Sequence, residues 1–225
     1  SSQSELNISE KVDVTAGGAV PVADGNVQVK SDVQTKTYIK NKDIKTKDDD
    51  IYFLTNSDIN IYTKSNVASY GGIAIADGTS IAENNKAVSS VIISSGVNSI
   101  SGRDTYIQSV CNKNIQAYMY ATTQGLIGAV GDSEAIAYND SFSEISIEEN
   151  AILKAYDSMN LTVLDKTIGL NATRKAKGTT YIVFGIPITI EGEGNETKKN
   201  DSKSLITLNG QLESGLGANR NLVIN

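Results

Sequence analysis

The sequence has no histidine and no tryptophan, and it contains only one cysteine, Cys111, and two prolines among its 225 residues. Without histidine, neither a Ser-His-Asp triad nor a Cys-His pair can form within the chain, and metal sites built on imidazole are excluded. A single cysteine cannot form an internal disulfide, so stability must come from packing and backbone pairing. A Walker loop and a Rossmann fingerprint are also missing. We therefore expect no enzyme activity, no metal and no cofactor.

Neither a basic surface nor a membrane span is indicated. Lys and Arg total 20 against 26 Asp and Glu, a formal net charge of −6. Such a chain lacks the positive patch that a nucleic-acid partner requires. No run approaches the roughly 20 apolar residues of a membrane helix, since the most apolar stretch, 181–190, is interrupted by Gly185 and Pro187. No signal peptide precedes Ser1, so we interpret the chain as a segment of a longer protein.

The chain contains an internal repeat. The segments AGGAVPVADG (16–25), YGGIAIADG (70–78) and QGLIGAVGDS (124–133) align with one another. Their first glycines are Gly17, Gly71 and Gly125, which are equally spaced (71 − 17 = 54 and 125 − 71 = 54). An acidic residue closes each segment, and these residues are Asp24, Asp77 and Asp132. A repeat kept over such a distance is typical of stacked, solenoid-like architectures.

The second part of each repeat has the order strand, polar turn, strand, aspartate. The copies are TYIKNKDIKTKDDD (37–50), SVIISSGVNSISGRD (90–104) and SEISIEENAILKAYD (143–157), and SLITLNGQLESG (204–215) resembles the third. The first three copies close on Asp50, Asp104 and Asp157. About four degenerate repeats of roughly 54 residues are therefore expected.

Alternating short segments such as Ile59-Asn60-Ile61 and Ile145-Ser146-Ile147 indicate strands with one buried face. Strands this short become stable when equivalent strands of successive repeats stack. We predict an all-β fold, a right-handed parallel β-helix (β-solenoid) spanning residues 1–225 as a single unit. A repeat of about 54 residues suits two coils of a three-sided solenoid, which gives about eight short coils.

The glycine-rich segments, together with ISIEENAILKA (145–155) and DSMNLTV (157–163), resemble the repeats of filamentous-haemagglutinin-like proteins. In style they are most similar to the leukotoxin-family filamentous adhesins of anaerobic bacteria. The resemblance implies export through an outer-membrane transport partner and folding outside the cell as a right-handed β-helix. It also implies an adhesive or toxin-associated role, and it carries no catalytic residue.

Acidic clusters are candidates for the metal or catalytic site of a polysaccharide-degrading β-helix. The best candidate is the run Asp48-Asp49-Asp50, but only Asp50 recurs in the later copies, as a turn position would. Asp24 and Asp77 are each followed by glycine, so we predict turns there and at Asp132. The structural interpretation is favoured for both sets.

Three other segments are candidate contact surfaces. The lysine-rich strand 38–47 could attract acidic partners, although such runs are usually solvated. The hydrophilic stretch 191–203 is predicted to be a surface loop insertion. It is a candidate recognition loop, although tolerated decoration of the surface is the favoured interpretation. The loop residues singled out are Gly192, Asn195, Lys198, Lys199 and Asp201. The tyrosines expected to point outward are Tyr106, Tyr118, Tyr120 and Tyr138. They could contact sugar or protein, or equally pack against neighbouring outward residues of the stack.

These features leave three hypotheses. In the first, the chain is a monomeric segment of a secreted or surface-displayed adhesin or leukotoxin that contacts a host-cell protein or glycan. In the second, it is a purely structural spacer that holds a distant tip away from the cell. The third, a polysaccharide-degrading enzyme, is the least favoured because no catalytic arrangement is evident.

Overall fold

The computed structural model describes residues 1–40, 42–181, 187–215 and 221–225. Every regular element in this part of the chain is a β-strand, which confirms the all-β prediction. The larger sheet follows the order β1 (Ser2–Gly18), β4 (Ile51–Ile93), β6 (Thr105–Ile147), β8 (Ser158–Tyr181), β12 (Asn221–Ile224). Added to it are β2 (Val22–Ile39) on β4, β10 (Glu193–Leu208) on β6, and β9 (Pro187–Glu191) on β8.

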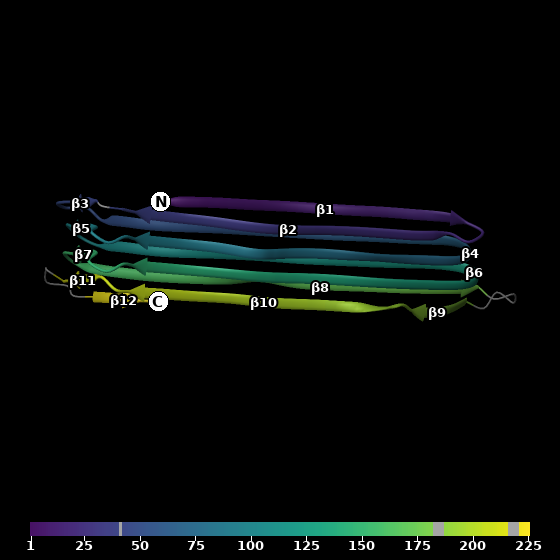
Figure 1. Ribbon diagram of the computed structural model, residues 1–225. Helices are drawn as coiled ribbons and strands as arrows, with labels where there is room; N and C mark the ends of the chain where they lie inside the picture. Colours follow the sequence, from purple (N-terminus) through teal and green to yellow (C-terminus); the bar gives the residue numbers. More distant parts are fainter. Residues whose placement is uncertain (41, 182–186, 216–220) are drawn as a thin grey trace.

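A smaller sheet lies at one end of the long strands (Figure 1). Its order is β11 (Gln211–Ser214), β7 (Ile152–Ala155), β5 (Asn98–Ser101), β3 (Asp43–Lys45). The strand pairs in both sheets are parallel, except for the antiparallel hairpin of β8 and β9. No helix able to cross a membrane occurs in the described ranges.

The two longest strands, β4 and β6, each consist of two legs that run in opposite directions (Figure 1). Residues 55–71 of β4 pair with β1, and residues 75–93 of the same strand pair with β2. We call the first part of each circuit the first leg and the second part the return leg. Side chains that alternate inward from the two legs meet and form the core between them. The result is a flat stack of long parallel strands (Figure 1).

The register of the ladder shows the length of one circuit. Ser2 pairs with Thr55, Ile51 with Thr105, and Thr105 with Met159. The sequence numbers of these partners differ by 53 or 54 (55 − 2, 105 − 51 and 159 − 105), so one circuit spans one whole repeat. The prediction of two short coils per repeat is therefore wrong. Polar residues inside the legs continue the strands, and side chains such as Ser109, Asn60 and Asn112 find hydrogen-bond partners there.

The short end of each circuit follows the predicted order of strand, polar turn, strand and aspartate. The return leg of β4 ends at Ile93, and β5 follows after a four-residue turn. A four-residue turn also joins β6 to β7, whereas a two-residue turn joins β10 to β11. At the opposite end, Gly71 pairs with Gly125 where the first leg turns into the return leg. A Cβ on Gly125 would lie 1.8 Å from the Gly128 carbonyl oxygen, so the turn requires glycine there.

The prediction that the acidic residues after the glycine-rich segments lie in turns is wrong. Asp24 and Asp77 are paired neighbours inside β2 and β4, and Asp132 lies inside β6. The Gly78 N–H donates to the Asp77 carboxylate at 2.7 Å, and the Ser133 N–H donates to Asp132 at 2.7 Å. Each carboxylate thus satisfies a local backbone donor, which allows the strand to continue through the Asp-containing dipeptide.

The prediction of a loop insertion at 191–203 is also wrong, because most of this stretch is a strand. Residues 193–208 form β10, which pairs in register with β6 from Glu193 opposite Asp132 to Leu208 opposite Ile147. The register offset rises from 55 at Thr180 opposite Gly125 (180 − 125) to 61 at Glu193 (193 − 132). The additional residues therefore precede β10, in the segment that contains the β8–β9 hairpin. Polar composition alone suggested a loop, but the stacked neighbour β6 supplies the pairing that β10 needs.

The core consists of two apolar clusters separated by polar side chains. One cluster contains Ile59, Ile61, Ile115 and Met119, and the other lies beside the short sheet and contains Ile107, Ile145, Ile147 and Leu161. Between them, buried hydroxyls connect the two legs. Thr55 donates to the Ser90 carbonyl oxygen at 3.0 Å, and Ser109 donates to the Ser89 carbonyl oxygen at 2.7 Å.

Replacement of Ile147 by aspartate tests the inward assignment. Ile147 is fully buried in the second cluster, so Ile147→Asp should lower the free energy of unfolding by several kcal/mol through an unpaired buried charge. The control is Ser146→Asp, one residue earlier and on the outward side of the same strand. Urea unfolding of the two variants should differ strongly. Equal midpoints would contradict the assignment.

Candidate functional site

Asp50 and its counterpart Asp104 form a ladder at the corner where each first leg begins. Asp50 accepts hydrogen bonds from the Asp104 N–H at 3.2 Å and from the Tyr52 hydroxyl at 2.9 Å. Asp104 in turn accepts from the Ser158 N–H at 2.8 Å and from the Tyr106 hydroxyl at 3.2 Å. The carboxylates thus link successive circuits, which is the structural role the sequence favoured.

The electrostatics of this corner follow from those bonds. The Tyr52 hydroxyl and then the Asp104 N–H lower the pKa of Asp50, because both bonds favour its charged form. The bond between Tyr52 and Asp50 also raises the pKa of Tyr52. Among the described residues, no group of three or more acidic or cysteine side chains is arranged to hold a metal ion.

The residues singled out in the predicted loop are spread along a strand and do not converge. Gly192 precedes β10, whereas the other four belong to it. Lys199 pairs with Asp201 at 2.8 Å, which raises the pKa of Lys199, and its amine lies 5.1 Å from the Tyr138 ring centroid. Lys198 and Asn195 are exposed. These side chains form part of the solvated surface of the return leg.

The lysine-rich strand lies at the edge of the smaller sheet. Lys40, Lys42, Lys45 and Lys47 are exposed, and Lys40 lies over the Tyr38 ring at 4.4 Å. The strand β3 within this segment pairs only with β5 among the described strands. Charged side chains at a sheet edge discourage pairing with other chains. The lysine content of this segment is therefore explained without a ligand.

Outward side chains of the first legs form a flat face that we call the tyrosine–amide face, defined by Asn7, Asn60, Tyr62, Asn114, Gln116 and Tyr118. Asn60 donates to Asn7 at 2.8 Å, and Gln116 donates to Asn114 at 2.9 Å. Tyr118 donates to Gln116 at 3.0 Å, and its ring centroid lies 5.4 Å from that of Tyr62. Five of these six residues, all but Tyr118, line a shallow hollow that extends over three circuits.

Beside this hollow, the tyrosine pattern continues along the first legs. Tyr52 and Tyr106 stack with centroids 5.0 Å apart and planes 8° apart. The Lys64 amine lies 5.2 Å from the Tyr120 ring centroid. Tyr106, Tyr118 and Tyr120 are half-buried, so part of each side chain stays accessible to solvent. The prediction that these side chains alternate outward agrees with the burial pattern of β6.

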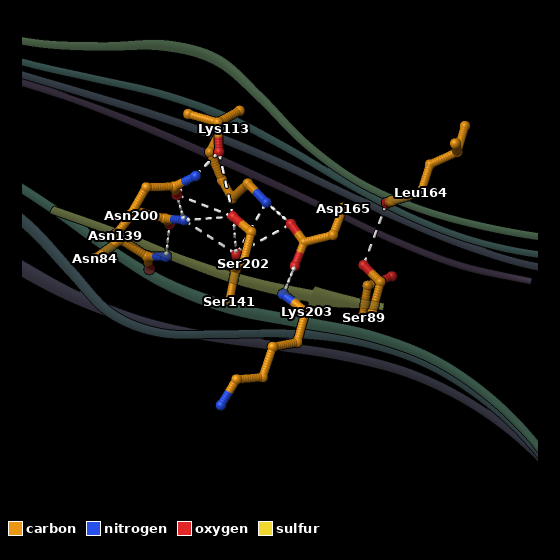
Figure 2. A network of polar contacts seen from close by, with 12 residues as sticks. Asn84, Ser89, Lys113, Asn139, Ser141, Leu164, Asp165, Asn200, Ser202 and Lys203 are labelled. Atoms are coloured by element: carbon orange, nitrogen blue, oxygen red, sulfur yellow. Dashed lines mark hydrogen bonds and ion pairs between the residues drawn. The ribbon is translucent and has the colours of Figure 1, made fainter. Parts of the chain in front are cut away.

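A second polar site lies inside the stack, and the sequence analysis missed it. The Lys113 amine is in contact with the Asp165 carboxylate, and the side chains are 0% and 1% exposed. Figure 2 shows Ser141 between them: Lys113 donates to the Ser141 hydroxyl at 2.9 Å, and that hydroxyl donates to Asp165 at 3.0 Å. The Lys203 N–H donates to the other oxygen of Asp165 at 3.2 Å. Inward side chains alternate along β6, so Lys113, two residues after the buried Cys111, also points inward. This alternation was the one signal in the sequence that could have revealed the site.

A column of polar side chains, most of them amides, lies in the return legs next to this site. Ser31, Asn84, Asn139 and Asn200 occupy paired positions in successive strands. Ser31 donates to Asn84 at 3.2 Å, Asn84 to Asn139 at 2.8 Å, and Asn139 to Asn200 at 2.7 Å (Figure 2). Each amide thereby satisfies the next, so the polar layer remains paired in the interior.

Burial controls the protonation of the groups in this interior site. Loss of hydration lowers the pKa of Lys113 to about 8, while the neighbouring Cys111 acts in the opposite direction. Burial also raises the pKa of the neighbouring Cys111 thiol. The site thus combines a dehydrated amine, a carboxylate and a connecting hydroxyl.

Removal of the buried cation should be costly. Lys113→Ala leaves Asp165 without its partner inside the stack, so the free energy of unfolding should fall by about 3–5 kcal/mol. Lys166→Ala, which removes an exposed amine next to Asp165 in the sequence, should change it by less than about 0.5 kcal/mol. Denaturant titration measures both values. A Lys113→Ala variant as stable as Lys166→Ala would show that the buried pair is not formed.

The single cysteine provides a probe of stack integrity. Cys111 is fully buried, and its raised pKa keeps it as the unreactive thiol. The folded chain should not be alkylated by iodoacetamide at neutral pH, whereas the urea-unfolded chain should be labelled completely. Mass spectrometry quantifies the adduct. Rapid labelling of the folded chain would contradict the position of β6 in the stack.

Comparison with known proteins identifies no relative. No family model matches the sequence, and no curated protein and no solved structure matches it either. Two features of the described residues bear on function: the outward tyrosine–amide face and the buried site around Lys113.

Proposed function

We propose that the chain is a segment of a secreted or surface-displayed bacterial filamentous adhesin, of the haemagglutinin or leukotoxin kind, that contacts host cells. In this proposal it is a right-handed β-helix of about four degenerate repeats of roughly 54 residues. Support comes from the parallel ladder, in which each circuit matches one repeat of the sequence in length. Further support comes from the repeat segments that resemble that family.

The observation that carries the proposal is the tyrosine–amide face. Its amides offer both donors and acceptors, and its tyrosines offer an apolar ring with a polar hydroxyl. Because Asn7, Asn60 and Asn114 come from three successive circuits, a ligand lying along the stack can contact several equivalent groups at once. An extended sugar chain, with regularly spaced hydroxyls and flat ring faces, fits this geometry. We therefore assign a cell-surface glycan as the partner.

A structural spacer is the second candidate, and a specific observation favours it. Several outward side chains of the face already bond to one another across or along the strands, as Asn60 does to Asn7 and Tyr118 does to Gln116. Such ladders stabilise a stack without any ligand. In that case the folded chain would be a rigid shaft and would bind no cell surface.

Cell binding distinguishes the two candidates. Fluorescently labelled chain should bind leukocytes or epithelial cells saturably, and unlabelled chain should compete. Replacement of both Tyr62 and Tyr118 by alanine should weaken this binding about tenfold or more, the range of aromatic binding hot spots. Flow cytometry measures the binding. Absence of binding by a folded sample would overturn the adhesive role in favour of the spacer.

Two controls identify the surface and the ligand. Tyr138→Ala removes an outward tyrosine from β6 in the return leg, away from the face, and should leave binding unchanged. Periodate oxidation of the cells cleaves sugar diols and should abolish binding if the partner is a glycan. Binding that survives periodate but is lost after protease treatment would point instead to a protein receptor.

A further inference from the structure

We infer that Lys113 and Asp165 become joined by an intramolecular isopeptide bond between the lysine Nζ and the aspartate Cγ. The two groups are in contact inside the stack, where their side chains are 0% and 1% exposed. Two groups hold the pair, the Ser141 hydroxyl and the Lys203 N–H. Close contact in a fixed orientation is the condition under which an amine and a carboxyl group condense without an enzyme.

The reaction is balanced within the pair. Transfer of one proton from the ammonium to the carboxylate gives a neutral amine and a neutral carboxylic acid. The amine lone pair then attacks Cγ, the Nζ–Cγ bond forms, and the Cγ–Oδ1 bond breaks. The departing oxygen leaves as one water molecule with protons from the amine and the acid. No oxidant, reductant or other reactant is required.

The surroundings favour each step. A dry interior disfavours the separated charges and therefore promotes the neutral amine that attacks, in keeping with the lowered pKa of Lys113. Ser141 accepts from Nζ at 2.9 Å and donates to Oδ1 at 3.0 Å, so its hydroxyl connects the donor and acceptor of the transferred proton (Figure 2). The Lys203 N–H bonds to Oδ2, which becomes the oxygen of the amide.

The position of the bond gives it a mechanical role. Lys113 lies in β6 and Asp165 in β8, which are adjacent strands of the larger sheet. The bond would close a loop between these two residues and attach the β8 circuit to the rest of the stack. At the position of Lys113, the paired strands carry Ile59 and Thr167. At the position of Asp165, they carry Ser57 and Cys111. In the described part of the chain, the pair therefore occurs once.

Mass spectrometry of the intact, denatured 225-residue chain tests the inference. The wild-type mass should be lower than the sequence mass by one water molecule. After digestion, trypsin should fail to cleave at Lys113, and a branched peptide should contain Lys113 and Asp165. A wild-type chain with the full sequence mass, whose Lys113 amine can be acetylated after denaturation, would overturn the inference.

Three variants separate this bond from other losses of water. Lys113→Arg keeps a cation but offers a guanidinium instead of an amine, and Asp165→Ala removes the carboxyl group, so both should have their full sequence mass. Asp165→Asn can form the same amide with loss of ammonia, so its product should equal the wild-type product in mass. This third variant keeps the test valid if the first two fold poorly. Water loss that persists in Lys113→Arg would indicate a succinimide, for example at Asp24-Gly25, and would contradict the bond.

Discussion

The parallel backbone ladder, in which each circuit is one repeat long, is the constraint on which the rest of the structure depends. It requires that equivalent residues of successive circuits lie next to one another, whatever their chemistry. Apolar residues then form columns, asparagines form amide ladders, and tyrosines form stacks. The face and the buried site described above are both products of this register. Neither requires a specialised loop.

The interior of a long, flat circuit is not apolar throughout. Its legs of roughly 20 residues extend over about 65 Å, and polar side chains are buried along them. Serine, threonine and asparagine between the two apolar clusters pair across the legs or along the stack. These bonds offset the cost of burying polar groups. The same layer holds Lys113 and Asp165 close together in a dry environment, so the inferred bond is a consequence of how the interior is filled.

The sequence predicted the all-β class, the repeat length and the inward isoleucines correctly, because strict alternation determines which side chains can be buried. Ile59, Ile61, Ile145 and Ile147 are examples. The short strands that it predicted are instead long, continuous legs. The path of a circuit could not be predicted in the same way. Polar residues such as Asn84 are found in turns and equally in amide ladders, and only the neighbouring strand decides between them. For the same reason, the segment that forms β10 was predicted to be a loop, and the charge pair across two distant segments was missed.

Disulfide trapping tests the register most directly. Asn60 and Asn114 are paired neighbours in β4 and β6, and adjacent parallel strands lie about 4.8 Å apart, within the range that a disulfide can bridge. In a Cys111→Ala background, Asn60→Cys with Asn114→Cys should therefore oxidise readily to an internal disulfide. Asn60→Cys with Lys86→Cys, which lies about half a repeat away, should not. Efficient bridging of the second pair and none of the first would contradict one long circuit per repeat.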